Sequence, residues 1–194
     1  MRRIAAPPWH GGSNDDPLVA TGRTLRWGVV ATGGIAGRTT SQLARLADAE
    51  LVAVSSRDAG KAATFARDHG FARGYSDTDA VTGYQHLAAD PEVEVVYVAT
   101  PHGQHHEVTA AMLRAGKHVL VEKAFTINAR EARELANLAR DRQLFLMEAL
   151  WTRFLPAFQY ALDVIEQGKI GAIRYVQAEL GFTAVDDPRS RLWA

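Results

Sequence analysis

The chain has 194 residues, 47% of them hydrophobic, and its 22 acidic residues balance its 22 basic residues. A formal net charge of zero predicts no electrostatic attraction to nucleic acid or to an anionic membrane surface. The sequence contains no cysteine, which excludes disulfides, thiolate metal sites and thiol nucleophiles, and it contains no apolar run long enough to span a bilayer.

Residues 1–24 have the composition of a disordered N-terminal extension. They hold three of the seven prolines and three of the sixteen glycines, and they show no apolar periodicity. Pro7 and Pro8 lie where an export signal would have its apolar core, so a cytoplasmic location is expected.

From Leu25 onward, short apolar runs alternate with amphipathic stretches. The runs predict buried strands at residues 27–31, 51–55, 95–99, 118–121 and 145–147. The stretches between them predict helices at residues 35–47, 59–69, 105–115 and 129–142. Such alternation predicts right-handed crossovers and a parallel sheet that helices cover on both faces. Residues 25–147 are therefore expected to form a Rossmann-type, doubly wound α/β domain.

The last part of the chain predicts the beginning of a second domain. Residues 156–167 have the pattern of a helix, and residues 173–180 alternate as a strand with one exposed face does. One helix and one strand are too few for an independent domain. Residues 148–194 are therefore expected to be the truncated start of an α+β domain.

The segment from Ala31 to Ala36 follows the first predicted strand and opens a helix. It matches the dinucleotide fingerprint G-x-G-x-x-A except at its first position, where alanine is acceptable if its φ angle is negative. The candidate cofactor-binding residues of this turn are Thr32, Gly33, Gly34 and Ile35. Gly33 would let the backbone approach a diphosphate, which the helix N-terminus would attract. A tight turn without a ligand is the alternative.

The end of the second strand indicates which dinucleotide is preferred. An acidic residue at this place would bind the ribose 2′-hydroxyl of NAD, but the sequence here is "SSRD". Ser56 and Arg57 offer a hydroxyl and a guanidinium to a 2′-phosphate, which favours NADP while leaving NAD possible. Asp58 is expected to cap the next helix. The alternative for Arg57 is an exposed side chain with no ligand.

Four segments together resemble a known family. They are Ala31–Ala36, Thr100-Pro101 with His105, Glu122-Lys123, and the segment "MEALWTRFLPAF" at residues 147–158. In this order the chain, from Arg26 to its end, resembles the Gfo/Idh/MocA oxidoreductases, and the last segment resembles their dihydrodiol dehydrogenase branch. The resemblance implies NAD(P)-dependent hydride transfer to or from a CH–OH group of a sugar, polyol or cyclic dihydrodiol. It also implies a second, open-sheet domain that commonly forms a homo-oligomer interface.

The resemblance also implies roles for individual residues. Thr100 and Pro101 would lie along the cofactor, and Glu122 would reach the nicotinamide ribose. Lys123 would be the catalytic residue that binds the reacting hydroxyl and helps to move its proton. A surface ion pair at a strand end is the alternative. The family usually has proline after this lysine, often with a cis bond, whereas Ala124 follows here. The Lys123-Ala124 bond is therefore either trans, which would re-aim the lysine, or cis without a proline.

The histidines of this region allow more than one interpretation. His105 occupies the family's motif position, where it would contact the cofactor or serve as a structural hydrogen-bonding group. His102 and His106 are four residues apart, as zinc ligands on a helix can be. We predict no metal site, because a helix starting near Gln104 would leave His102 in the preceding turn.

Two residues are candidates for the substrate pocket. Trp151 follows the last strand of the nucleotide domain and would be a pocket wall or a core aromatic. Arg174 begins the strand predicted in the second domain and would reach a polar substrate or remain solvated. A nucleotide-binding module or inactive fragment, lacking the second half of the active site, is the alternative to an active oxidoreductase.

Overall fold

The computed structural model describes residues 22–181, and the predicted disordered extension lies almost entirely outside this range. The described residues belong to two compact units, one ending at Trp151 and the other beginning at Thr152.

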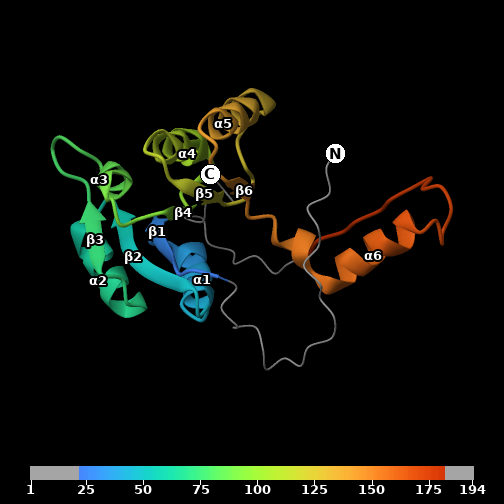
Figure 1. Cartoon of the computed structure of the whole chain (residues 1–194), viewed down its shortest axis with the longest axis horizontal. Helices are drawn as coiled ribbons and strands as arrows, with labels where there is room; N and C mark the ends of the chain where they lie inside the picture. Colours follow the sequence, from blue (N-terminus) through green and yellow to red (C-terminus); the bar gives the residue numbers. More distant parts are fainter. Residues whose placement is uncertain (1–21, 182–194) are drawn as a thin grey trace. The chain divides into compact units, whose positions relative to one another are not determined.

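Six strands of the first unit form one sheet in the order β3-β2-β1-β4-β5-β6 (Figure 1). They are β1 (Leu25–Val30), β2 (Ala49–Ser56), β3 (Arg73–Ser76), β4 (Val95–Val98), β5 (His118–Val121) and β6 (Leu146–Glu148). Every neighbouring pair is parallel, which confirms the predicted doubly wound sheet. The strand order reverses between β1 and β4, and ligands bind to such sheets outside the carboxyl ends at this point.

Five α-helices and a short 3₁₀-helix connect the strands. They are α1 (Gly34–Leu43), α2 (Ala59–His69), α3 (Gly83–Ala89), η1 (His102–Gln104), α4 (His105–Arg114) and α5 (Ala129–Asp141). Asp58 caps α2, as predicted, by accepting a hydrogen bond from the Lys61 amide at 2.8 Å. Asn128 caps α5 in the same way, because its side-chain oxygen accepts from the Glu131 amide at 2.9 Å.

Some boundaries differ from the sequence prediction. Helix α1 ends at Leu43 rather than near residue 47, because the Leu46 amide bonds to the Leu43 carbonyl in a tight turn and β2 already begins at Ala49. Strand β3 and helix α3 were not predicted. Strand β3 has only four residues, and Tyr75 is its single large apolar side chain, so no apolar run marks it.

The strands alternate their side chains between two cores, one on each face of the sheet. Helices α3, α4 and α5 cover one face, and α1 and α2 cover the other (Figure 1). One core, under α3, α4 and α5, includes Leu87, Val96, Val98, Met112, Val119, Val121 and Leu135. The other core, under α1 and α2, includes Val29, Ala36, Val54, Phe65, Phe71 and Tyr97. Because both faces are covered, the strand ends are the parts of the sheet that remain available to a ligand.

The second unit contains α6 (Pro156–Glu166), which the sequence predicted, preceded by a 3₁₀-helix at Trp151–Phe154 that begins on the last residue of the first unit. The prediction of a strand at residues 173–180 is wrong: these residues are exposed and form no hydrogen-bonded ladder with the described residues. A strand needs a hydrogen-bonded neighbour, and the described residues of this unit supply none. Across residues 22–181, none of the helices is both long and apolar enough to cross a bilayer.

Candidate active site at the carboxyl edge of the sheet

Strand pairing brings the candidate residues to one edge of the sheet. The Ala31 amide donates to the Ser55 carbonyl at 2.9 Å, which places the turn after β1 beside the end of β2. The Glu122 amide donates to the Val98 carbonyl at 2.9 Å, which places the end of β5 beside β4. Following the strand order from β2 to β5, this edge carries Ser56-Arg57, the turn at residues 31–35, Thr100-Pro101 and Glu122-Lys123.

The turn after β1 leaves open space above its glycines. Gly33 is the N-cap of α1, and no atom lies within 4 Å of a Cβ built on Gly33 or Gly34. The first turn of α1 contains no acidic residue to repel an anion, and Ile35 is exposed. The main-chain amides of a helix N-terminus therefore face a space where a diphosphate could bind.

Ala31 does not meet the condition under which alanine would be unstrained at this position, a negative φ angle. Its φ is +95°, in the region that favours glycine. The turn therefore keeps the backbone path of the glycine fingerprint even though a side chain is present. Alanine at the first fingerprint position therefore leaves the conformation of the turn unchanged and is itself strained there.

At the end of β2, the Ser56 hydroxyl is hydrogen-bonded to another residue, whereas the Arg57 guanidinium is not. The Thr32 hydroxyl donates to the Ser56 hydroxyl at 3.3 Å, so the glycine turn and the end of β2 are linked directly. Ser55 is buried, with its hydroxyl unpaired among the described residues. Arg57 is exposed, and its guanidinium bonds to no residue within 22–181. It is therefore available to a phosphate group.

The end of β4 presents a hydroxyl that no other described residue binds. The Oγ1 atom of Thr100 is buried and makes no hydrogen bond within the described part of the chain. Pro101 is exposed beside it. His105 is fully buried, and its Nδ1 and Nε2 atoms lie 2.8 Å from the Ala124 carbonyl and 2.9 Å from the Thr100 carbonyl. This geometry matches the structural role considered for His105, and a cofactor contact remains a prediction.

Glu122 lies in a buried hydrogen-bond chain that begins on α1. The Tyr97 hydroxyl donates to Oε1 of Glu122 at 2.6 Å. Because a hydroxyl carries one hydrogen, Tyr97 accepts from the Thr39 hydroxyl, 3.1 Å away. Burial, together with the bond to Glu122, raises the pKa of Tyr97 above its ordinary value. The other Glu122 oxygen accepts from the Lys123 amide at 3.1 Å.

Lys123 and Glu122 face different environments, as expected for neighbouring residues at a strand end. Glu122 is 9% exposed, whereas Lys123 is exposed and its ammonium has no partner among residues 22–181. The Lys123-Ala124 peptide bond is cis.

The described residues contain no cluster of three or more His, Cys, Asp or Glu side chains that could hold a metal ion. His102 lies in η1, and its Nε2 donates to the Lys123 carbonyl at 3.0 Å. His106 lies in α4, and its Nε2 is 3.0 Å from a Glu134 oxygen. The two histidines therefore contact different groups.

The two candidates for substrate contact are both exposed. Trp151 ends the first unit with 60% of its surface exposed. Arg174 belongs to the second unit, in the segment that is paired with no strand of the described chain. The structure adds no contact that assigns either residue to the site.

Sequence reasoning missed Tyr97, Thr39 and Glu148. Tyr97 stands in the apolar run "VVYV", which indicates a core strand and gives no sign that its hydroxyl bonds to Glu122. Glu148 ends β6, and its Oε1 accepts from the Phe125 amide at 2.9 Å. No local pattern could have signalled these contacts, because each joins residues more than 20 positions apart.

Comparisons with known proteins agree with this architecture. Residues 25–150 match the model of the Gfo/Idh/MocA group, described as an oxidoreductase family with an NAD-binding Rossmann fold. The chain is 44% identical over 172 residues to trans-1,2-dihydrobenzene-1,2-diol dehydrogenase of Sus scrofa, covering 88% of this chain and 50% of that protein. It is 42% identical to D-xylose 1-dehydrogenase (NADP(+)) of Hypocrea jecorina, covering 83% and 43%. The chain thus spans about half the length of these relatives.

Solved structures give the same result. The 3-ketoreductase KijD10 of Actinomadura kijaniata, in complex with NADP and TDP-benzene, is 33% identical with a TM-score of 0.67, over 75% of this chain and 43% of that one. The apo scyllo-inositol dehydrogenase of Lactobacillus casei, 22% identical with a TM-score of 0.69 over 77% and 43%, shares the fold. With its doubly wound sheet, its glycine turn and these relatives, the chain belongs to the Gfo/Idh/MocA family of oxidoreductases and resembles the dihydrodiol dehydrogenases within it.

Proposed function

We propose that this chain is the nucleotide-binding part of an NADP-dependent oxidoreductase, with NAD as a possible second cofactor. The enzyme would transfer hydride between the nicotinamide and a CH–OH carbon of a sugar, a polyol or a cyclic dihydrodiol. The observation that carries the proposal is that the side-chain polar groups of Arg57, Thr100 and Lys123, at the carboxyl edge of the sheet, have no hydrogen-bond partner within residues 22–181.

Each part of NADP has a group suited to it along this edge. The exposed guanidinium of Arg57 and the Ser56 hydroxyl suit a 2′-phosphate. The open turn at Gly33 suits the diphosphate, since a side chain there would occupy the space. The unpaired Thr100 hydroxyl supplies a buried donor or acceptor farther along the same edge. These residues therefore fit the dinucleotide in their order as well as in their chemistry.

The chemistry divides between the cofactor and the protein. The bound dinucleotide would take up or supply the hydride. Lys123 would bind the reacting hydroxyl and move its proton, because no other residue between 22 and 181 binds its ammonium. Glu122, held by Tyr97, would approach the nicotinamide ribose and fix the Lys123 amide.

Names of relatives support the substrate class. Two relatives are a dihydrodiol dehydrogenase and a D-xylose dehydrogenase, and a structural neighbour is a 3-ketoreductase bound to NADP. All three names describe reactions at a carbon that carries an alcohol or a ketone. Trp151 and Arg174 are proposed to contact the substrate. Cytoplasmic location and homo-oligomeric assembly of the whole protein also remain proposals, which fractionation and light scattering would test.

The test combines two measurements. Calorimetric titration with NADPH and NADH measures binding, and nicotinamide absorbance with trans-dihydrobenzenediol or D-xylose measures turnover. Turnover above about 1 s⁻¹, the low end for ordinary enzymes, that disappears in Lys123→Met would support the oxidoreductase. Binding without turnover would support the second candidate, a nucleotide-binding module. Lack of NADPH binding would contradict both.

A further inference from the structure

The main chain at residues 123–125 leaves the sheet, and side chains hold it in place. Strand β5 ends at Val121, and the bond from the Glu122 amide to β4 is the last one in its ladder. Beyond it, four side chains bind the backbone polar groups. They are Glu122 on the Lys123 amide, His102 on the Lys123 carbonyl, His105 on the Ala124 carbonyl and Glu148 on the Phe125 amide.

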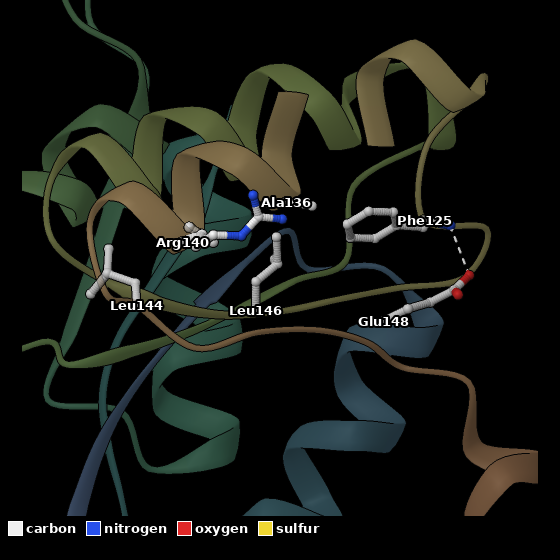
Figure 2. Close-up of a pocket in the computed structure, with 7 residues that line it drawn as sticks. Phe125, Ala136, Arg140, Leu144, Leu146 and Glu148 are labelled. Carbon is white, nitrogen blue, oxygen red and sulfur yellow. Dashed lines mark hydrogen bonds between the residues drawn. The ribbon is translucent and has the colours of Figure 1, made fainter. Parts of the chain in front are cut away.

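Glu148 differs from the other three in where it comes from. Glu122 is part of the loop itself, and the two histidines lie on η1 and α4. Glu148 ends β6, where it pairs with Val121 of β5. Its carboxylate therefore fastens the loop to the outer strand of the sheet, and Figure 2 shows this bond between Phe125 and Glu148 as a dashed line.

The surroundings of Glu148 are mostly apolar. It lines a cleft of about 470 Å³ between α5 and β6, together with Phe125, Ala136, Ala139, Arg140, Leu144 and Leu146 (Figure 2). The Arg140 guanidinium bonds to the Asn137 side chain. Within residues 22–181, the Phe125 amide is the single hydrogen-bond donor to the Glu148 carboxylate, which forms no ion pair there.

A half-buried carboxylate beside apolar side chains loses hydration, so its position costs free energy unless a donor compensates. Leucine at this position would extend the apolar lining without that cost. Among the described residues, the Glu148 carboxylate binds one group, the Phe125 amide, which is two residues from Lys123. The geometry therefore indicates that Glu148 holds the main chain of the loop at residues 123–125, rather than filling the cleft.

We propose that Glu148 is a positioning residue, which orients the Lys123 ammonium by fixing the Phe125 amide. This inference rests on the proposed function, since it assigns Lys123 to the nicotinamide end of the cofactor. A loop fixed before the ligand arrives holds the proton-transfer group in place and reduces the entropy lost on binding. The effect on Lys123 passes through two peptide units, and Glu148 itself touches no substrate.

The first test measures hydrogen exchange of the Phe125 amide by NMR on the full chain without cofactor. Glu148→Ala should speed this exchange about tenfold, the effect of losing one hydrogen bond to a charged acceptor. Glu148→Gln, which keeps an acceptor oxygen, should restore most of the protection. Arg140→Ala is the matched control, because it changes the same cleft without touching the loop. Unchanged exchange in Glu148→Ala, or equal exchange in the Gln and Ala variants, would overturn the proposal.

The second test separates positioning from general stability. Glu148→Ala should weaken NADPH binding about fivefold, while 2′-phospho-ADP-ribose, which lacks the nicotinamide, should bind as to the wild type. Equal weakening for both ligands would overturn the inference. If the wild type binds neither ligand, the proposed function fails, and the exchange experiment still decides the role of Glu148. If Glu148→Ala does not fold, Glu148→Asp replaces it, because the shorter side chain withdraws the carboxylate and should give the same two effects.

Discussion

The turn that follows β1 and the loop that follows β5 lie at the same edge of the sheet, yet different groups hold them in place. The turn at residues 31–34 is joined to β2 by the Ala31 amide and the Thr32 hydroxyl, and it leaves open space above Gly33 and Gly34. The loop at residues 122–125 is bound by side chains from η1, α4 and β6, and its Glu122 is bound in turn by Tyr97 of β4.

This difference follows from what each segment would do. A diphosphate is bound by several backbone amides at once, so the turn needs access for the anion and few side chains. A proton-transfer group must stay within hydrogen-bond reach of one atom, so its main chain needs to be fixed. Substitutions in the turn should therefore change ligand affinity more than stability, and substitutions that release the loop should do the opposite.

The largest effect is expected at Gly33. Gly33→Val should weaken NADPH binding about 100-fold, or about 2.7 kcal/mol, because the new side chain fills the open space. The melting temperature should change little, since φ at Gly33 is −79° and the conformation is extended. Calorimetry and thermal unfolding measure the two effects. Gly22→Val, which adds the same side chain in open space before β1, is the control. Equal NADPH affinity in the two variants would contradict the interpretation that the space above Gly33 binds the diphosphate.

Tyr97→Phe tests how the loop is held. Removing the hydroxyl leaves the buried Glu122 with one donor fewer, so the free energy of unfolding should fall by about 2 kcal/mol. The pKa of Tyr97 is raised in the folded state, so this stabilisation is present below pH 10 and is lost as the pH rises above it, where the unfolded tyrosine ionises. Urea unfolding should show the gap between wild type and variant narrowing above pH 10.

Thr39→Val is the control for this measurement. It removes the donor to Tyr97 but keeps the bond from Tyr97 to Glu122. The free energy of unfolding should therefore fall by less than in Tyr97→Phe, and the variant should still lose stability above pH 10. A gap that stays constant from pH 7 to pH 11 would mean that Tyr97 is not held protonated by the fold.

Arg57→Ala tests the 2′-phosphate end of the edge. It should weaken NADPH binding about tenfold, as expected for one charge-assisted contact near the surface, and should leave NADH binding unchanged. Lys61→Ala removes a positive charge from the same helix start and should have a smaller effect. Equal losses for NADPH and NADH would remove Arg57 from the selection of the cofactor.

The smallest effect concerns the backbone of the turn. Ala31→Gly should raise the free energy of unfolding by about 0.5–1 kcal/mol, because glycine adopts a φ of +95° without strain but loses more entropy on folding. Ala36→Gly, in the buried helical part of α1, should instead lower it by a similar amount. Chemical denaturation measures both, and a destabilised Ala31→Gly variant would show that the turn is not strained.

The sequence predicted the elements whose pattern is local. Apolar runs, four of them rich in valine, located five of the six strands. The glycine turn and Lys123 were expected at strand ends, which parallel pairing brings to one edge. Strand β3, too short to form an apolar run, was missed, and the strand predicted at residues 173–180 has no neighbour to pair with. The alternation of apolar and polar residues indicates which side of a segment is apolar, but a strand forms only where a neighbouring strand supplies hydrogen bonds.

By itself, the sequence determined the Rossmann-type fold, the strand-end position of Gly33 and Lys123, and the resemblance to the oxidoreductase family. Only the tertiary structure decided the positive φ of Ala31, the chain from Thr39 through Tyr97 to Glu122, and the bond from Glu148 to the Phe125 amide. The reason is physical: the strand order makes neighbours of residues that are 20 or more positions apart, and a hydrogen bond depends on that proximity rather than on any local pattern.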